Sequence, residues 1–393
     1  MYRKSLKSLH LQNLLSFGPD SQPITFGPLN VLIGPNGSGK SNLIEAIGLL
    51  AATPRSLSDA LREGGGAVEW LWKGSKNSAS ANIEATVARP LLEMDESYPP
   101  LVHTLQFGEN AQRLVIEDED IRTLPFLDEA EELYFSYVVG RPSIRLRGAL
   151  RVIDSREFKT TESVLSQRRD PDLYPELAFL ESFYSDMALY RDWSFGRTMP
   201  PRLPQPADLP NEQLLPDARN LGLILNLIRK NPEAKEALLK HLSVLYEGIR
   251  DVDVSVVGGT VQVFLHEHKW IIPATRLSDG TLRWLSLLAI LLNPQPRSLV
   301  CIEEPEMGLH PDLLPPLAQL LREASERMQL IVTTHSDVLV DALTDTPESV
   351  IVCEKHEGST QTRRLDGGEL SEWLKKYSLG QLWRRGEIGG NRW

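Results

Sequence analysis

The stretch Gly34-Pro35-Asn36-Gly37-Ser38-Gly39-Lys40-Ser41 decides the fold of this chain. It matches the phosphate-loop pattern G-x-x-x-x-G-K-[ST] at every fixed position. The apolar run Leu29 to Ile33 ends where the loop begins, and apolar residues then recur at helical spacing from Leu43 to Ala51. A strand, a glycine loop and a helix point backbone N–H groups and a helix N-terminus at a phosphate. The motif therefore predicts a nucleotide site rather than an ordinary turn.

We expect the backbone of this loop to cradle the phosphate groups of a nucleotide. Lys40 would add a cation at the outer phosphates, and Ser41 a hydroxyl ligand for Mg²⁺. The residues predicted to bind nucleotide in this segment are Asn36, Gly37, Ser38, Gly39, Lys40, Ser41 and Asn42.

Length and composition indicate a large globular protein. The chain has 393 residues, of which 41% are hydrophobic and 24% charged, and its formal net charge is −11. No apolar run approaches the roughly 18 residues of a membrane helix, and no signal-peptide core follows Met1. We therefore expect a cytoplasmic protein without a membrane partner. Cys301 and Cys353 lie in apolar strand-like runs, which favours buried free thiols, although the sequence leaves a disulfide open.

Three later segments carry further candidate site residues. The first is Leu277-Ser278-Asp279-Gly280, which opens an apolar helix. Ser278 or Asp279 can cap that helix, and Gly280 lets backbone approach a ligand closely. A helix N-terminus of this kind can bind a phosphate, but the same residues also suit a plain helix cap.

The other two segments are apolar strands that end in polar side chains. Leu299 to Ile302 is followed by Glu303 and Glu304, at the end of a strand where open α/β sheets place their ligands. One carboxylate can hold Mg²⁺ and the next can orient or deprotonate water. A second strand ends at His335, which could contact a γ-phosphate or polarise the attacking water. Taken singly, each cluster is equally well explained as a charged or hydrogen-bonding strand end.

The order of these four segments resembles the ATP-binding-cassette superfamily. In that family, the LSxG-type signature of one subunit faces the phosphate loop of another, and two ATP molecules are held in a head-to-tail dimer. The resemblance implies that Ser278 and Gly280 act on the nucleotide of a second copy. It also places Gly308-Leu309-His310 in the loop at the dimer interface.

The same resemblance assigns the catalytic roles. Glu303 takes the position of the Mg²⁺-linked acid, Glu304 that of the catalytic glutamate, and His335 that of the switch histidine. Gln167 begins the expected insertion, where the family's glutamine links Mg²⁺ and the attacking water to the lid; a solvated loop glutamine is the alternative. Glu303 departs from the family, which has Asp there, so the Mg²⁺ geometry and turnover rate stay open.

The opening LHLQNLLSF, the GPNGSGKS loop and the IEEPEMGLHP stretch resemble the RecF/SMC-like group. The resemblance is nearest to predicted ATPases related to OLD-family nucleases (AAA_21/AAA_15-like) and covers nearly the whole chain. It implies an α/β fold: a P-loop NTPase ABC-type head with a mixed β-sheet flanked by helices. We expect the head at 1–167 and 251–393, with a mainly helical lid inserted at 168–250.

For the remaining segments the sequence predicts only the kind of secondary structure. The stretch 200–216 is rich in proline and is expected to be an extended surface loop, and 251–272 reads as a hairpin turning at Gly258-Gly259. An acidic segment, Glu117 to Asp120 and Asp128 to Glu132, is most simply explained as a solvated face or loop. The end of the chain reads as two strands and an amphipathic helix from Glu369.

Possible partners follow from the resemblance and from charge. Residues 336–393 are too few for the nuclease domain of full OLD proteins, so we expect any nuclease or other effector to be a separate chain. DNA is a candidate partner, although the net charge of −11 argues against a general basic coat. The candidate phosphate contacts are Arg141, Arg145, Arg147, Arg151, Arg168, Arg169, Arg384 and Arg385.

The sequence therefore predicts an ATPase that dimerises with ATP and serves DNA repair, chromosome maintenance or anti-phage defence. Two alternatives remain open: an ATP-gated nucleic-acid clamp with negligible turnover, and the ATP-binding subunit of a transporter. A GTPase is less favoured, because the chain has no N-K-x-D guanine-reading motif.

Overall fold

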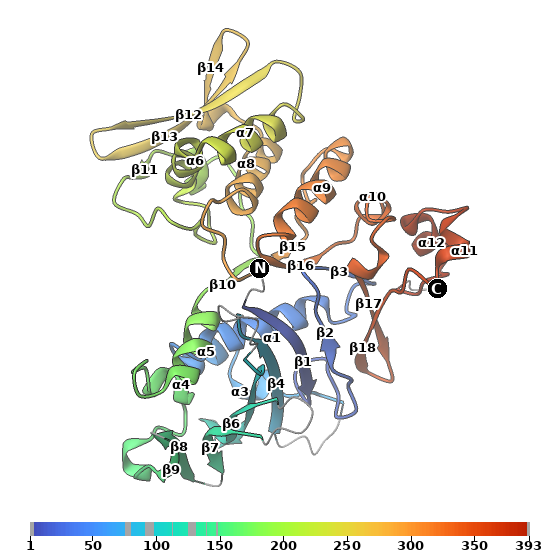
Figure 1. Cartoon of the computed structure of the whole chain (residues 1–393). Coiled ribbons are helices and arrows are strands. Elements are labelled where there is room, and N and C mark those ends of the chain that lie inside the picture. Colours follow the sequence, from blue (N-terminus) through green and yellow to red (C-terminus); the bar gives the residue numbers. More distant parts are fainter. Residues whose placement is uncertain are drawn as a thin grey trace. The chain divides into compact units, whose positions relative to one another are not determined.

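The computed structural model describes residues 4–74, 80–90, 98–111, 113–124, 131–138, 140–146 and 148–390. The chain divides into two compact units (Figure 1). The first consists of Met1–Met187, Ile351–Leu365 and Ile388–Trp393, and the second of Ala188–Val350 and Asp366–Glu387. This division does not coincide with the expected segments 1–167, 168–250 and 251–393, which remain a prediction.

The first unit contains an antiparallel sheet in the order β2-β1-β4-β5-β6-β7-β8-β9. Its strands alternate buried and more exposed residues, as expected of a sheet with one face on a core. The strands are β1 (Ser5–Gln12), β2 (Ile24–Thr25), β4 (Ser80–Ala88), β5 (Leu101–Asn110), β6 (Arg113–Thr123), β7 (Leu133–Val138), β8 (Arg141–Leu146) and β9 (Ala149–Val152).

The phosphate loop lies between β3 (Leu29–Ile33) and α1 (Lys40–Ala52), which confirms the predicted strand and helix. Every residue of β3 is buried, and Leu43, Ile44 and Leu50 put the apolar face of α1 in the core. The remaining elements of this unit are α2 (Leu57–Glu63), α3 (Ala67–Trp70), η1 (Ser155–Glu157), α4 (Val164–Gln167), α5 (Pro175–Ser185), β17 (Val350–His356) and β18 (Ser359–Arg364). Figure 1 shows α1 and α5 side by side.

The second unit carries the two strands predicted to end in site residues. β15 (Leu299–Glu303) and β16 (Gln329–Thr333) pair in parallel and are almost entirely buried. The helix α8 (Asp279–Leu291) is buried over most of its circumference, as its continuous apolar sequence predicts. Around them lie β10 (Met187–Tyr190), η3 (Ala274–Arg276), η4 (Pro311–Leu313), α9 (Leu314–Ser325), α10 (Asp337–Asp341) and η5 (Pro347–Ser349).

A smaller antiparallel sheet also belongs to the second unit. β12 (Ile249–Val257) and β13 (Thr260–Glu267) form the predicted hairpin, and the chain turns at Gly258 and Gly259, which both have positive φ. Short strands β11 (Gln205–Pro206) and β14 (Trp270–Pro273) pair with β13. The helices α6 (Leu221–Lys230) and α7 (Pro232–Leu242) pack on the hairpin and on α8, as Figure 1 shows.

Three expectations from the sequence need correction. The proline-rich stretch is not simply a surface loop, because Pro201 and Arg202 in η2 (Pro200–Arg202) are buried and Arg202 donates to the carbonyl of Phe195 at 2.6 Å. The helix expected from Glu369 is two short helices, α11 (Ser371–Leu374) and α12 (Leu379–Arg385). Within the acidic segment Glu119 is fully buried, while residues 125–130 lie outside the described part of the chain.

Candidate active site

The phosphate loop has the backbone geometry of an anion cradle. Gly39, the residue before α1, has φ 99°, and Gly37 has φ 78° with no atom within 4 Å of the position a Cβ would occupy. Among the described residues, no side chain caps α1, and its first turn has no acidic residue. Within the described part of the chain, the first turn of α1 thus lacks a capping side chain and an acidic side chain, which fits a phosphate ligand at this end of the helix.

The side chains of the loop differ in burial and in hydrogen bonding. The buried amine of Lys40 donates to the carbonyls of Gly34 (2.7 Å) and Pro35 (3.0 Å), so it is folded back along the loop. Ser38 Oγ is buried and has no hydrogen-bond partner among the described residues. Asn36 and Ser41 are exposed, and Asn42 is half-buried.

A brace from β18 supports the loop, and the sequence analysis missed it. The Thr360 hydroxyl donates to the carbonyl of Ser38 at 3.0 Å, so it must accept from the Ser16 hydroxyl at 2.7 Å. A Cβ on Gly39 would lie 2.2 Å from Thr360 Oγ1, which explains why only glycine fits there. Nothing local in the sequence marks Thr360, because it lies far along the chain from the loop.

Glu304 follows β15 in an unusual backbone conformation. Its φ is 44°, a region that non-glycine residues seldom adopt. Both of its peptide groups are held: its N–H donates to the carbonyl of Thr333 at 3.1 Å, and its carbonyl accepts from Arg283 at 2.9 Å. The surrounding structure thus enforces a strained backbone at this carboxylate, as happens at functional sites.

His335 and Glu304 lie together, as their predicted roles require. His335 Nε2 is 3.5 Å from Glu304 Oε1, and both side chains are about one-third exposed, at 37% and 38%. Glu306, which the sequence analysis did not single out, accepts from the backbone N–H of His335 (2.9 Å) and from the Thr334 hydroxyl (2.6 Å). The E-E-P-E run was its only signal in the sequence.

Glu303 is placed differently from Glu304. Its carboxylate lies 3.1 Å from Arg191 Nε, so an arginine of the same unit neutralises the predicted Mg²⁺ ligand. Within the described residues, no group of three or more His, Cys, Asp or Glu side chains could hold a metal. Magnesium keeps several waters and binds largely through nucleotide phosphates, so it needs only one or two protein oxygens. The roles predicted for Ser41 and Glu303 remain predictions.

The predicted signature segment begins α8. Ser278 caps the helix by accepting from the Thr281 N–H at 3.1 Å, and its side chain is exposed. A Cβ on Gly280 would lie 2.7 Å from the carbonyl oxygen of Gly308, so the signature glycine packs directly on the predicted interface loop. The N-terminus of α8 therefore reaches the surface of its own unit, where a second copy could use it.

Arg283, three residues further along α8, is another residue that the sequence analysis missed. Its guanidinium group lies over the rings of Trp193 (5.3 Å) and Phe195 (5.8 Å), besides its bond to Glu304. Burial lowers the pKa of Arg283, and the charges of Glu306 and Glu304 oppose that change. Arg283 thus ties the signature helix to the backbone of Glu304.

Gln167 ends α4 and is occupied within its own loop. Its Oε1 accepts from the N–H of Lys159 at 2.8 Å, and its Nε2 donates to the carbonyl of Glu162 at 2.8 Å. The alternative of a merely solvated glutamine does not describe this amide. A role at Mg²⁺ remains a prediction.

The predicted site residues therefore form groups within each unit. The phosphate loop and Gln167 belong to the first unit; Ser278, Gly280, Glu303, Glu304 and His335 belong to the second. Cys301 and Cys353 are buried free thiols, as expected, and burial raises the pKa of Cys353 to about 12. No helix in the described part of the chain has the length and apolar character to cross a membrane.

Comparison with known proteins places this geometry in a family. A family model described as "AAA domain, putative AbiEii toxin, Type IV TA system" matches residues 29–341. The DNA replication and repair protein RecF of Thermosynechococcus vestitus is 29% identical over 198 residues, which is 48% of this chain and 48% of that protein. The chain thus spans about half the length of the curated relative it matches.

Solved structures show the same fold. The Smc head bound to the C-winged-helix domain of ScpA has a TM-score of 0.57 at 15% identity, covering 93% of this chain and 99% of that one. The Smc head with an extended coiled coil from Pyrococcus furiosus, bound to the C-terminal domain of ScpA, has a TM-score of 0.55 at 14% identity, covering 95% and 99%. The mixed α/β fold of a P-loop ABC-type head is therefore confirmed. With the family model matching most of its length, the chain belongs to the AAA_21 family; it is similar in sequence to RecF and shares the fold of Smc heads.

Proposed function

We propose that this protein hydrolyses ATP to ADP and phosphate and that ATP joins two copies head to tail. The observation that carries the proposal is the pair formed by Glu304 and His335, 3.5 Å apart at the ends of adjacent parallel strands. The strained backbone of Glu304 (φ 44°) supports a functional role, because a purely structural strand end has no need of such strain.

In the proposed reaction the phosphate loop binds the phosphates of ATP, and Glu304 at the end of β15 acts on the attacking water. Lys40 exchanges the carbonyls of Gly34 and Pro35 for phosphate oxygens, and Ser41 supplies a hydroxyl for Mg²⁺, which would neutralise charge on the phosphates. Glu304 orients the attacking water and accepts its proton. His335 donates to the γ-phosphate and so reports whether it is present.

Dimerisation follows from the exposed signature segment. Ser278 lies at the surface at the N-terminus of a 13-residue helix, which is a suitable donor end for phosphate. The signature glycine, Gly280, packs against the carbonyl of Gly308. Binding of a second copy at Ser278 would therefore shift the loop that follows Glu304. We therefore assign Ser278 and Gly280 to the nucleotide of the partner copy.

The substitution Glu304→Gln tests the catalytic assignment. Without the base, ATP turnover should fall by about 100-fold or more, whereas ATP still binds because Lys40 and the loop are intact. The variant should accumulate as a dimer with ATP and Mg²⁺, measured by gel filtration with light scattering and by steady-state phosphate release. Lys40→Ala is the matched control, which should neither bind ATP nor dimerise. Turnover at the parental rate in Glu304→Gln would show that Glu304 is not the base.

One observation favours the ATP-gated clamp as a second candidate. The carboxylate of Glu303, already longer than the family's aspartate, is paired with Arg191 at 3.1 Å. If that pair persists with ATP bound, the Mg²⁺ shell lacks a ligand and turnover is slow. Steady-state ATPase rates with and without DNA, for the parent and for Glu303→Asp, separate the two: a clamp shows dimerisation by the parent without measurable phosphate release.

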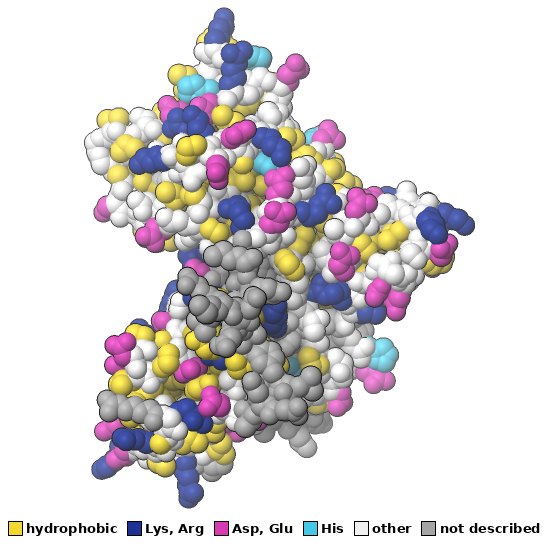
Figure 2. Space-filling view, in the orientation of Figure 1, with side chains coloured by type: hydrophobic (Ala, Val, Ile, Leu, Met, Phe, Trp, Pro, Cys, Tyr) yellow, Lys and Arg dark blue, Asp and Glu magenta, His cyan; other side chains and the backbone are white. Residues whose placement is uncertain are grey.

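For the biological role, we propose work on DNA in chromosome maintenance or anti-phage defence, together with a separate effector chain. The match to RecF and the description of the family model support it. The charge distribution gives this role no support, because Figure 2 shows Lys and Arg interspersed with Asp and Glu on the face in view. Several predicted phosphate contacts are also engaged within the protein, as Arg384 is with Asp337 at 3.1 Å. Arg147 lies outside the described residues.

A further inference from the structure

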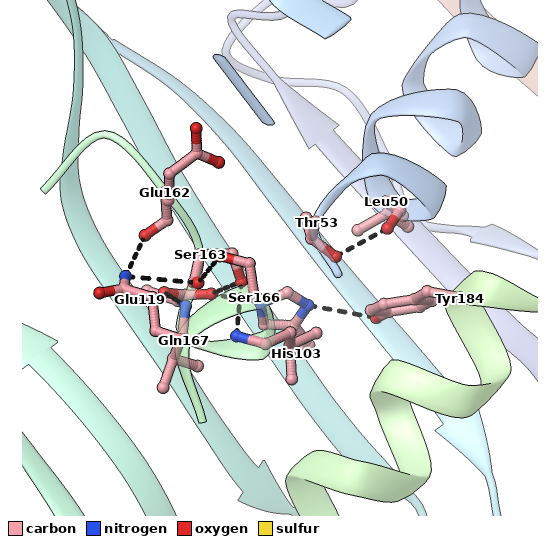
Figure 3. Close-up of polar contacts among 11 residues, drawn as sticks. Leu50, Thr53, His103, Glu119, Glu162, Ser163, Ser166, Gln167 and Tyr184 are labelled. Carbon is pink, nitrogen blue, oxygen red and sulfur yellow. Dashed lines mark hydrogen bonds and ion pairs between the residues drawn. The ribbon is translucent and has the colours of Figure 1, made fainter. Parts of the chain in front are cut away.

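A buried polar cluster in the first unit is unexplained by the parts assigned so far (Figure 3). It joins four elements: His103 on β5, Glu119 on β6, Ser163 immediately before α4, and Tyr184 on α5. The exposed fraction of each of these four side chains is 0%. A carboxylate buried this deeply is costly unless hydrogen bonds compensate for its lost hydration, so its partners show what it holds in place.

Glu119 caps the short helix α4. Its Oε2 accepts from the N–H of Val164 at 2.9 Å, and its Oε1 accepts from the hydroxyl of Ser163. Ser163 Oγ in turn accepts from the N–H of Leu165 at 3.1 Å. Glu119 and Ser163 together thus satisfy two N–H groups that a helix of this length leaves without partners.

His103 extends the cluster from Glu119 to α5. His103 Nε2 lies 3.1 Å from Glu119 Oε1, and Nδ1 lies 3.2 Å from the hydroxyl of Tyr184. Burial, and then the charge of Glu119, raise the pKa of Tyr184, so its hydroxyl keeps its proton. Because Glu119 Oε1 accepts from Nε2, the neutral ring has only Nδ1 left as an acceptor for that hydroxyl. This fixes the tautomer from the partners: Nε2 carries the hydrogen and donates to Glu119.

The cluster is not itself a catalytic site. Ser163 and His103 both direct their hydrogen bonds to the same carboxylate, so no base activates the serine. No solvent reaches any of the four side chains, so no substrate could either.

The far end of α4 is Gln167, whose amide is predicted from the family resemblance to link Mg²⁺ and the attacking water to the lid. The helix has only four residues, so its capped N-terminus fixes where Gln167 lies. In this structure the amide bonds to the backbone of Lys159 and Glu162, as Figure 3 shows for Glu162. The helix α5, which carries Tyr184, packs on both α4 and the phosphate-loop helix α1.

We propose that Glu119 is a positioning residue for ATP hydrolysis. By capping α4 it fixes the amide of Gln167, and through His103 and Tyr184 it ties that helix to α5 and hence to α1. The inference rests on the proposed function and deepens it, because it names the buried group that fixes the position of Gln167 relative to the phosphate-loop helix α1.

A double-mutant cycle on ATP turnover tests this. Glu119→Gln should lower kcat about tenfold and leave KM for ATP within about twofold, since no group that touches ATP has changed. In a Gln167→Ala background, Glu119→Gln should cause no further loss, because Glu119 acts through that amide. If the losses multiply, Glu119 only stabilises the fold and the proposal is overturned.

A milder pair of variants serves if Glu119→Gln does not fold. Tyr184→Phe removes one hydroxyl from the cluster and should lower kcat with the same dependence on Gln167. Tyr190→Phe is the matched control, because that hydroxyl is also buried but donates to the carbonyl of Leu214 at 2.7 Å, outside the cluster. Equal effects of the two substitutions on kcat would overturn the proposal.

Hydrogen exchange without nucleotide gives a readout independent of activity. The amides of Val164 to Gln167 should exchange faster in Glu119→Gln, whereas α2, which Glu162 caps through the N–H of Leu57 at 2.8 Å, should be unchanged. Unaltered exchange in α4 overturns this inference and leaves the proposed function standing. Absence of ATPase activity in the parent overturns the proposed function instead, and the exchange result then still tests the capping of α4.

Discussion

Glu304 combines a strained backbone with the proposed role of catalytic base. Its position after β15 was predicted from the sequence, but its φ of 44° was not, because no local pattern favours that conformation for glutamate. The bonds to Thr333 and Arg283 hold it there, and these residues are 29 and 21 positions away along the chain. The conformation aims the carboxylate at His335, where the proposed chemistry needs it.

This strain gives a prediction that concerns stability alone. Because a left-handed backbone costs roughly 1–2 kcal/mol for a residue with a Cβ, Glu304→Gly should be more stable than Glu304→Ala by about 1 kcal/mol. Thermal or urea unfolding of the two variants measures the difference. The exposed residue Asp312, which does not have positive φ, serves as the control site, and there alanine should equal or exceed glycine. Alanine exceeding glycine at 304 would mean that the backbone relaxes at little cost.

At the scale of elements, the strand β3 and the helix α1 needed only local information. A continuous apolar run of five residues, a glycine loop and a helical repeat specify them almost independently of the rest of the chain. The capped start of α8 was readable for the same reason, since Ser278 caps it with a local bond. What supports the loop was not readable, because the brace comes from β18.

The brace predicts a specific loss of nucleotide affinity. Thr360→Val keeps the side-chain shape but leaves the carbonyl of Ser38 and the hydroxyl of Ser16 without their partner. A buried group left unsatisfied costs about 1–3 kcal/mol, so the Kd for ATP should rise about tenfold. Fluorescent-nucleotide titration measures it, with Thr362→Val on the same strand as the control. Equal affinities for all three proteins would show that β18 does not shape the loop.

The acidic run on β6 was misread at this scale. The unbroken run of acidic residues favoured a solvated face, yet Glu119 is fully buried, because its capping of α4 and its bond to His103 replace water. A run of like charges cannot reveal which member points inward. Only the pairing of β6 with β5, which places His103 and Glu119 on one face, decides it.

At the scale of the whole molecule, the proposal requires two copies, and mixing inactive variants tests it. Lys40→Ala removes the phosphate loop's cation and Ser278→Arg blocks the signature end, so each variant alone should be inactive. If Ser278 acts in trans, a mixed dimer has one intact site, formed by Lys40 of one copy and Ser278 of the other. An equal mixture should then restore up to about half of the parental rate, because each mixed dimer has one intact site of two and Lys40→Ala does not pair with itself.

The mixing experiment also has a clear negative outcome. If Ser278 served the nucleotide of its own chain, every site in the mixture would contain one defect and activity would stay at the level of the single variants. Steady-state phosphate release measures both cases, and light scattering on the mixture confirms that dimers form. Dimers without recovered activity would contradict the head-to-tail arrangement.

The sequence by itself determined the nucleotide loop, the strands that flank it and the polar residues at the strand ends, because each depends on neighbours a few positions away. The tertiary structure decided the rest: the strain at Glu304, the support of the loop by Thr360, and the burial of Glu119 beneath α4. These depend on hydrogen bonds between residues far apart in the chain, whose partners are chosen by strand pairing and helix packing and leave no periodic trace in the sequence.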